Sequence, residues 1–113
     1  MMDKKIQNQL VQIGLSTEKV KKIILFGSRA VGDNTDRSDI DLAIVAPEMS
    51  KEEWVLFALD LEDELDTLLS LDIIKFEDAS QQLKSEILKN GKLLYQDDDI
   101  PNEMEKDNFI ESP

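Results

Sequence analysis

A chain of 113 residues with no cysteine, no histidine and a net charge of −12 is long enough for one small domain. Without cysteine it can form neither disulfides nor thiolate metal sites, which agrees with a cytoplasmic location. Without histidine it has no imidazole ligand, imidazole base or Ser–His–Asp triad. Any catalysis must use carboxylates, hydroxyls, lysine or arginine.

The negative charge also restricts the partners. The 25 acidic residues outnumber the 13 basic ones, and the basic residues are scattered along the chain. Such a surface repels a polyanion, so we expect no direct binding of nucleic acid. A nucleotide that arrives with Mg²⁺ remains acceptable because the metal brings positive charge. No apolar run is long enough for a membrane helix, and we expect neither a membrane segment nor a signal peptide.

The apolar pattern in the first third of the chain predicts a helix, a strand and a short helix. Apolar residues at helical spacing indicate a helix over residues 3–14 that ends near Gly14. A β-branched run over residues 22–26 indicates a strand buried on both faces. Gly27-Ser28 then turns the chain into a short helix, which Gly32 can end in a left-handed conformation.

A polar loop over residues 33–38 leads into a second strand over 39–45. Ser50 and Glu53 fit a capping box at the start of a longer helix. The face expected to point inward carries Trp54, Phe57, Ala58, Leu61, Leu65 and Leu68. The acidic run Glu62, Asp63, Glu64 and Asp66 is interpreted as the solvated face of that helix.

The remaining pattern predicts a third strand over residues 71–76, with Asp72 at its start. Asp78 is expected to cap a last helix that ends at Asn90-Gly91. Its inward residues are expected to be Leu83, Ile87 and Leu88. Residues 93–95 are then expected to form an edge strand. The fold class is therefore α/β (α+β), with a small mixed sheet flanked by helices.

The composition changes after residue 96, so we divide the chain into a domain over 1–96 and an acidic tail over 97–113. The tail carries seven acidic residues against the single Lys106. Such a segment is expected to be disordered in isolation. The alternative is that its apolar residues dock on a partner; these are Ile100, Met104, Phe109 and Ile110.

Two short motifs frame the segment that carries the chemistry. Asp39 and Asp41 are two residues apart in a strand, so their carboxylates point to the same face. Gly27-Ser28 lies at the end of the preceding strand and meets them if the two strands are antiparallel. Asp72 joins them if the third strand runs parallel to the second. We therefore expect three carboxylates to converge beside a Gly-Ser turn.

This combination suits phosphoryl or nucleotidyl transfer with two Mg²⁺ ions, because hard cations prefer carboxylate oxygens. Ser28 and the nearby backbone N–H groups suit the phosphates of a nucleoside triphosphate. Arg29 is a further candidate phosphate contact, or bridges only to surface acids. Asp72 is a candidate third metal ligand and is also placed to take the proton of the attacking hydroxyl. An acid that only caps a strand is the alternative for Asp72.

Gly27-Ser28, ten further residues and then Asp39-Ile40-Asp41 resembles the signature of the DNA polymerase beta-like nucleotidyltransferases. The flanking residues resemble the minimal nucleotidyltransferases, or MNT proteins, over about residues 5–96. The resemblance implies a polymerase beta-like nucleotidyltransferase core, Mg²⁺ and ATP. It also implies that Gly27 and Ser28 contact the nucleotide, and that Asp39, Asp41 and Asp72 bind metal.

MNT proteins pair with an all-helical HEPN protein, and the resemblance implies an antitoxin that transfers AMP from ATP to that toxin. Val31 stands where many relatives have a basic residue, which leaves one phosphate or partner contact open. Because larger nucleotidyltransferases continue into a helical acceptor-binding domain, we also expect this protein to have no acceptor site of its own. Two alternatives remain: a small-molecule acceptor held together with a helical partner subunit, or an antitoxin that inhibits by binding alone.

Overall fold

Four short strands form one mixed sheet in the order β3-β2-β1-β4. The central strand β1 is antiparallel to both neighbours, β2 and β4, whereas β2 and β3 are parallel. The antiparallel β1–β2 pair and the parallel β2–β3 pair are the orientations that the predicted site requires, whereas the partner of β4 was not predicted. The structure, a computed structural model, describes residues 4–32 and 39–97. The strands are β1 (Lys22–Phe26), β2 (Ile40–Val45), β3 (Leu71–Lys75) and β4 (Lys92–Gln96).

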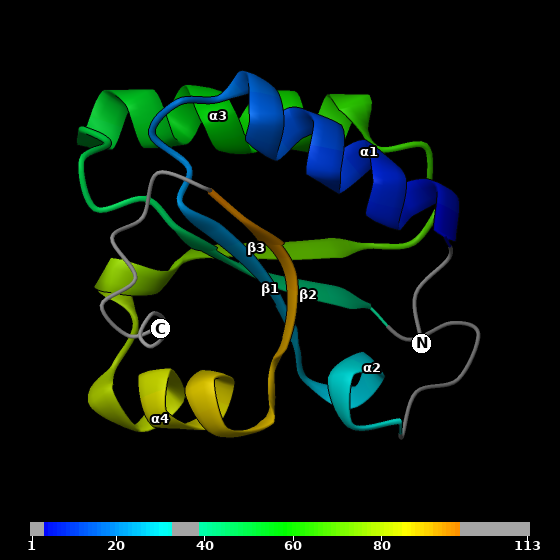
Figure 1. Cartoon of the computed structure of the whole chain (residues 1–113), viewed down its shortest axis with the longest axis vertical. Coiled ribbons are helices and arrows are strands. Elements are labelled where there is room, and N and C mark those ends of the chain that lie inside the picture. The colour runs from blue at the N-terminus through cyan, green and yellow to red at the C-terminus, as the bar shows by residue number, and fades with distance from the viewer. Residues whose placement is uncertain (1–3, 33–38, 98–113) are drawn as a thin grey trace, which may run out of the picture.

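Helices cover both faces of this sheet (Figure 1). α1 (Lys4–Ser16) and α3 (Lys51–Glu64) lie on one face, and α2 (Ser28–Val31) and α4 (Gln81–Asn90) lie on the other. A 3-10 turn, η1 (Phe76–Asp78), connects β3 to α4. No helix within the described ranges is long and apolar enough to cross a membrane.

The core is divided by the sheet, because alternate side chains of a strand point to opposite faces. On β2, Leu42 and Ile44 join the larger cluster, which includes Leu10 of α1 and Leu61 of α3. Ala43, between them, joins a smaller cluster with Ile24 and Ile87 of α4. Three consecutive buried residues, Ile23, Ile24 and Leu25, confirm that β1 is buried on both faces.

The first helix is longer than its sequence pattern predicts, because Gly14 does not end it. Gly14 lies inside α1 beneath the ring of Tyr95, and a Cβ at this position would come within 2.6 Å of that ring. The glycine therefore permits close packing of α1 on β4. The helix ends at Ser16 instead, where the Thr17 hydroxyl donates to the Ile13 carbonyl at 2.8 Å.

The start of α3 is as predicted, but the last residue that was expected to face the core does not do so. Ser50 and Glu53 form the complete capping box. The helix ends at Glu64, so the chain has left the helical path before Leu68, which is fully exposed. The prediction that Leu68 faces the core was therefore wrong.

Two details of the last helix also differ from prediction. Ser80, not Asp78, is the N-cap of α4, and its hydroxyl accepts from the Leu83 N–H at 3.1 Å. Asp78 instead lies in η1, which begins at Phe76 and thereby shortens the third strand by one residue. Leu88, expected to face inward, is 67% exposed, because Ile87 alone occupies the buried position of this turn.

β4 confirms the predicted edge strand and brings the chain back to β1. Asp97, which follows it, donates its N–H to the Lys21 carbonyl at 2.8 Å and pairs with the Lys21 ammonium at 3.4 Å. The predicted loop over residues 33–38 and the predicted disorder beyond Asp97 lie outside the described residues. The division of the chain at residue 96 therefore stays a prediction.

Candidate active site

The backbone at Gly27 brings the end of β1 into contact with a carboxylate of β2. Gly27 has φ 77° and ψ −155°, a conformation that residues with a side chain rarely adopt. A Cβ at this position would lie 2.2 Å from Oδ2 of Asp41. The glycine is therefore needed twice, for the turn and for the close approach of Asp41.

The short helix α2 starts from this turn. The carbonyl of Gly27 accepts from the Ala30 N–H at 3.1 Å, and Gly32 ends the helix with φ 85°, as predicted. Ser28 is half-buried at the first position. Arg29 is only 6% exposed, so this residue does not extend over an open surface. Ser28 and Arg29 thus lie directly after the glycine that touches Asp41.

Two of the three predicted carboxylates, Asp41 and Asp72, lie on neighbouring strands, and Asp39 directly precedes β2. Asp41 pairs in register with Asp72 on one side and with Phe26 on the other. Asp39 is two residues before Asp41, which puts both on the same side of the chain. Asp39 and Asp72 are exposed and Asp41 is half-buried. The register thus places Asp41 beside both Gly27 and Asp72, and the joint role of the three carboxylates stays a prediction.

These carboxylates influence one another electrostatically. The pKa of Asp41 is raised above its usual value, first by burial and then by the negative charges of Asp72 and Asp39. Each of these effects disfavours the ionised form of Asp41. The ionised cluster is therefore unfavourable by itself and becomes favourable when a cation binds.

The cluster suits an ion that takes only part of its ligands from the protein. Among residues 4–32 and 39–97, no three acidic side chains are close enough together to hold a metal ion by themselves. Mg²⁺ commonly binds through one or two carboxylates, with water and phosphate oxygens completing its octahedron. The oxygen donors and the mutual repulsion at Asp41 fit Mg²⁺ held jointly with a nucleotide.

Phe26 is a neighbour of the site that the sequence patterns did not single out. It is half-buried, directly precedes Gly27 and pairs in register with Asp41. Its position at the end of an apolar strand, directly before the Gly-Ser turn, was the sequence feature that could have identified Phe26 as a neighbour of the site.

Comparison with known proteins identifies the family. The family model described as "Polymerase beta, Nucleotidyltransferase" matches residues 8–100. The chain belongs to this family. It is therefore a nucleotidyltransferase by family and by fold, as its Gly-Ser and Asp-x-Asp motifs predicted. The comparison with curated proteins found no match.

Several solved structures share the fold of this polymerase beta nucleotidyltransferase. A chain of a toxin–antitoxin complex with AMP-PNP is 26% identical, with a TM-score of 0.64 over 81% of this chain and 74% of that chain. The MntA-HepT toxin–antitoxin gives 24% identity and a TM-score of 0.62 over 84% and 74%. These likenesses confirm the fold and agree with the predicted resemblance to MNT antitoxins.

A third structure comes from Shewanella oneidensis and is described as a tri-AMPylated HEPN toxin in complex with an MNT antitoxin. Its matching chain is 24% identical, with a TM-score of 0.63 over 85% of this chain and 74% of that chain. At this identity the likeness establishes the fold.

Proposed function

We propose that this nucleotidyltransferase is the antitoxin of a toxin–antitoxin pair and transfers AMP from ATP to a HEPN-domain toxin. The observation that carries the proposal is the contact of Asp41 with Gly27, in register with Asp72. It joins the expected nucleotide-binding turn to the expected metal ligands. The similar chain solved with AMP-PNP in a toxin–antitoxin complex supports both the nucleotide and the kind of partner.

In the proposed reaction, Gly27 and Ser28 hold the β- and γ-phosphates through backbone N–H groups and the serine hydroxyl. Arg29, which is buried directly after them, reaches the phosphates only where they enter between the elements that cover it. Asp39, Asp41 and Asp72 hold two Mg²⁺ ions. Bound Mg²⁺ supplies the positive charge that neutralises the triphosphate and lowers the pKa of the attacking hydroxyl. The residues of the chain mainly position the groups, so the lack of histidine is no obstacle.

The transfer itself exchanges one phosphorus–oxygen bond for another. The hydroxyl oxygen of the acceptor forms a bond to the α-phosphorus of ATP, and the bond from the α-phosphorus to the bridging oxygen breaks. Pyrophosphate leaves with the electron pair of that bond. The hydroxyl proton goes to the carboxylate of Asp72, which lies beside Asp41 at the exposed end of β3. The acceptor leaves as a phosphodiester of AMP.

Intact-mass spectrometry tests this proposal. The full chain is purified with the HEPN protein encoded beside it and incubated with ATP and Mg²⁺. We expect the partner to gain about 329 Da for each AMP transferred by nucleotidyl chemistry. The matched control is the Asp39→Asn/Asp41→Asn variant, which removes the metal-binding charge but keeps the side-chain shape. It should form the complex and transfer nothing.

Two further results would change the conclusion. If the partner gains no mass while a tight complex forms, inhibition occurs by binding alone, or the acceptor is a small molecule. Metal binding is checked independently of activity by thermal unfolding with Mg²⁺ and a nucleotide analogue. We expect these ligands to raise the Tm of the wild type and leave that of the Asp39→Asn/Asp41→Asn variant unchanged. Equal shifts for both proteins would contradict the assigned ligands.

A further inference from the structure

The helix α3 is apolar on both sides, although only one side packs on the sheet. Its inner side provides Phe57 and Leu61, which are 8% and 1% exposed. Its outer side carries Val55, Leu56 and Leu59, which are 50%, 64% and 57% exposed. Because residues three and four apart are neighbours on a helix, these three side chains form one contiguous patch. We call Val55, Leu56 and Leu59 the outer patch.

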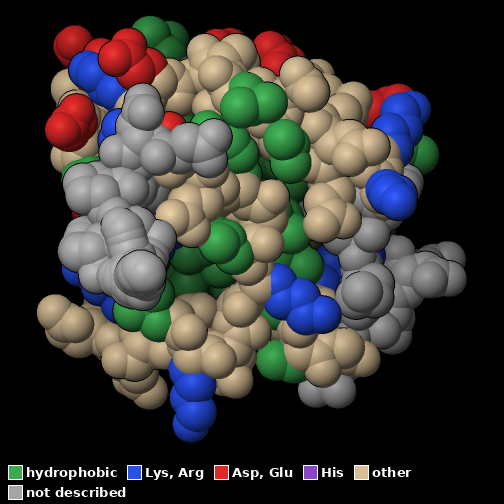
Figure 2. All heavy atoms as spheres, in the orientation of Figure 1, with side chains coloured by type: hydrophobic (Ala, Val, Ile, Leu, Met, Phe, Trp, Pro, Cys, Tyr) green, Lys and Arg blue, Asp and Glu red, His purple; other side chains and the backbone are tan. Residues whose placement is uncertain are grey.

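Acidic side chains surround the outer patch. Within α3 the acidic residues outnumber the one basic residue, Lys51, and all of them are exposed. By helical spacing, Glu52 lies one turn before the patch and Asp63 one turn after it. The complete acidic set is Glu52, Glu53, Asp60, Glu62, Asp63 and Glu64. Figure 2 shows acidic side chains gathered along the upper edge of the molecule, over the layer of α1 and α3.

A hollow of about 430 Å³ adjoins the patch beside Leu56. Met49 and Phe57 provide apolar lining. Its acidic residues are Glu18, Glu53 and Asp60, and its basic residue, Lys19, is paired with Glu53. An apolar side chain of a partner fits against this lining while a neighbouring cation meets the acids. The hollow therefore repeats the chemistry of the outer patch: apolar contact bordered by negative charge.

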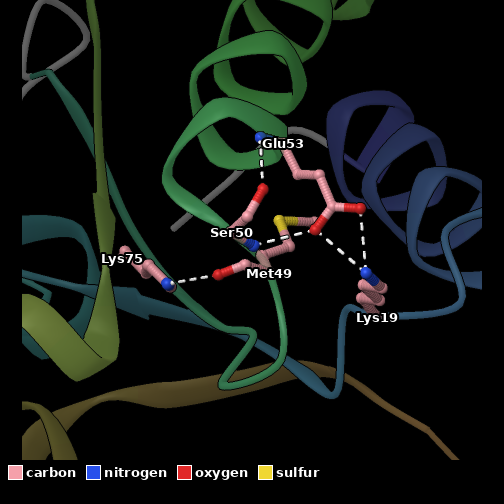
Figure 3. A network of polar contacts seen from close by, with 5 residues as sticks. All are labelled: Lys19, Met49, Ser50, Glu53 and Lys75. Carbon is pink, nitrogen blue, oxygen red and sulfur yellow. Dashed lines mark hydrogen bonds and ion pairs between the residues drawn. The ribbon is translucent and has the colours of Figure 1, made fainter.

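The helix is fixed at both ends, so its outer face is preformed. At the start, Glu53 accepts from the Ser50 N–H at 2.8 Å and pairs with Lys19, while Lys75 of β3 donates to the Met49 carbonyl at 2.9 Å (Figure 3). Beyond the end, Asp66 pairs with Lys5 of α1. A preformed surface loses less conformational entropy when it binds.

Charge decides among the possible occupants of this face. A second copy would bring a second acidic α3 against the first, and like charges oppose that contact. The segment over residues 98–113 has six acidic residues against Lys106, so it is repelled for the same reason. A helix with lysine or arginine on both sides of an apolar stripe complements both features of the surface.

We propose that the outer face of α3 is the docking surface for a basic amphipathic helix of the partner protein. For the identity of that partner the proposal rests on the proposed function, in which it is the HEPN toxin. Asp41 shares the sheet face of Ala43 and α4, whereas α3 covers the opposite face. Docking and nucleotide transfer therefore use opposite sides of the sheet and can be disrupted separately.

The test compares two exposed leucines of α3 with one exposed leucine of α4 in the full chain. Leu56→Ser/Leu59→Ser removes most of the outer patch, and the control Leu88→Ser removes a leucine of similar exposure from α4. Affinity for the purified HEPN protein is measured by titration calorimetry. We expect the α3 variant to bind at least about 10-fold more weakly, as for truncation of a central apolar contact, and the control to bind like the wild type. Asp63→Lys should also weaken binding, most strongly at low salt.

The outcomes separate this proposal from the proposed function. If the HEPN protein binds the wild type and the α3 variant equally, the docking surface is wrong and the proposed function stands. If it does not bind the wild type, the assigned partner is wrong. The surface is then tested with a synthetic amphipathic peptide of about 18 residues, five helical turns, with leucines flanked by arginines. Binding that is lost in Leu56→Ser/Leu59→Ser, and absent when glutamates replace the arginines, supports the surface; equal binding to both proteins overturns it.

Discussion

Gly27 connects two functions that are usually treated separately, the geometry of a turn and the position of a carboxylate. Its φ of 77° turns the chain from β1 into α2, and its missing side chain leaves room for Asp41 Oδ2. Gly32 has a similar φ of 85°, but a Cβ there would meet no atom within 4 Å. An alanine at position 32, where ψ is 10°, meets only the strain of the left-handed conformation. An alanine at position 27, where ψ is −155°, meets a different strained conformation and also the collision with Asp41.

We expect Gly27→Ala to lose more stability than Gly32→Ala. At Gly32 the alanine takes the left-handed conformation, which costs about 1–2 kcal/mol, and at Gly27 it takes a conformation essentially restricted to glycine, which costs about 1–3 kcal/mol. At Gly27 the new Cβ also collides with Asp41, so the total loss should exceed that of Gly32→Ala by about 1 kcal/mol or more. Urea unfolding of the two variants and the wild type measures both values. Equal losses would contradict the contact.

The collision can be isolated with a double variant. Asp41→Ala removes the oxygen that the new Cβ would meet, so Gly27→Ala should cost less in the Asp41→Ala background than in the wild type. Additive losses would show that strain alone explains the effect of Gly27→Ala.

Most of the candidate site could be predicted because its residues are close in the sequence. Gly27, Ser28, Asp39 and Asp41 come from one stretch, and period-two alternation is enough to orient the two aspartates. The prediction that Asp72 joins the site depended on β2 and β3 being parallel, and the local sequence pattern alone does not determine that orientation. The conformation of Gly27 and its contact with Asp41 required coordinates, because both arise from the packing of β1 on β2.

At the scale of single elements, the start of α3 depends on the charge of Glu53. Lys19 lowers the pKa of Glu53 to about 2, mainly through its hydrogen bond, with help from the Ser50 N–H. Because the pKa of Glu53 is lower in the folded protein than the usual glutamate value of 4.5, ionised Glu53 stabilises the fold at pH values above 4.5. The stabilisation is lost as the pH falls toward about 2.

We therefore expect Glu53→Gln to lower the Tm at pH 7, with the difference from the wild type shrinking as the pH falls from about 4.5 to about 2. Because glutamine still accepts a hydrogen bond from the Ser50 N–H, the decrease in Tm measures the contribution of the negative charge of Glu53. Circular dichroism melts across this pH range measure it. The control Glu52→Gln removes a charge from the same turn and leaves the Lys19–Glu53 pair intact. A difference that stays constant with pH would contradict the assigned role.

The elements themselves were largely predictable from caps and periodicity. Ser50 and Glu53 marked the start of α3 because their side chains satisfy backbone N–H groups locally. The errors came from residues whose environment is set by distant contacts. Gly14 lies inside a helix because Tyr95 packs on it. Ser80 rather than Asp78 is the N-cap of α4 because Asp78 is part of η1, which precedes that helix. The outer patch was missed because apolar residues occur on both sides of α3.

At the scale of the molecule, the elements described over residues 4–32 and 39–97 form a four-stranded sheet with a core on each face. The buried residues run from Ile6 to Ile87, and β4 closes the order β3-β2-β1-β4. The sheet order itself could be predicted only in part. The antiparallel β1–β2 pair followed from the need to form one site, whereas the bulge between Ile23 and Ile24 opposite β4 had no sequence signal.

A chain ending at Asp97 should therefore fold. We expect cooperative unfolding with a Tm within about 4 °C of the full chain, a shift that corresponds to less than about 1 kcal/mol in a domain of this size. The variant keeps Asp97 because this residue pairs with Lys21. Differential scanning calorimetry of both proteins measures the difference. A fall of more than about 10 °C would show that the tail belongs to the domain and that the division at residue 96 is wrong.

The position of Asp72 on an outermost strand has a consequence for solubility. Strands at the border of a sheet offer unpaired backbone groups to other molecules, and charged side chains discourage such pairing. In the order found here β3 is such a strand, and Asp72 and Lys75 are its charged residues beside Leu71, Ile73 and Ile74. Neutralising Asp72 therefore removes a charge that discourages aggregation through the edge strand, and it also removes a proposed Mg²⁺ ligand. Soluble yield must accompany any activity measured for an Asp72 variant, because inactive protein and aggregated protein would otherwise look the same.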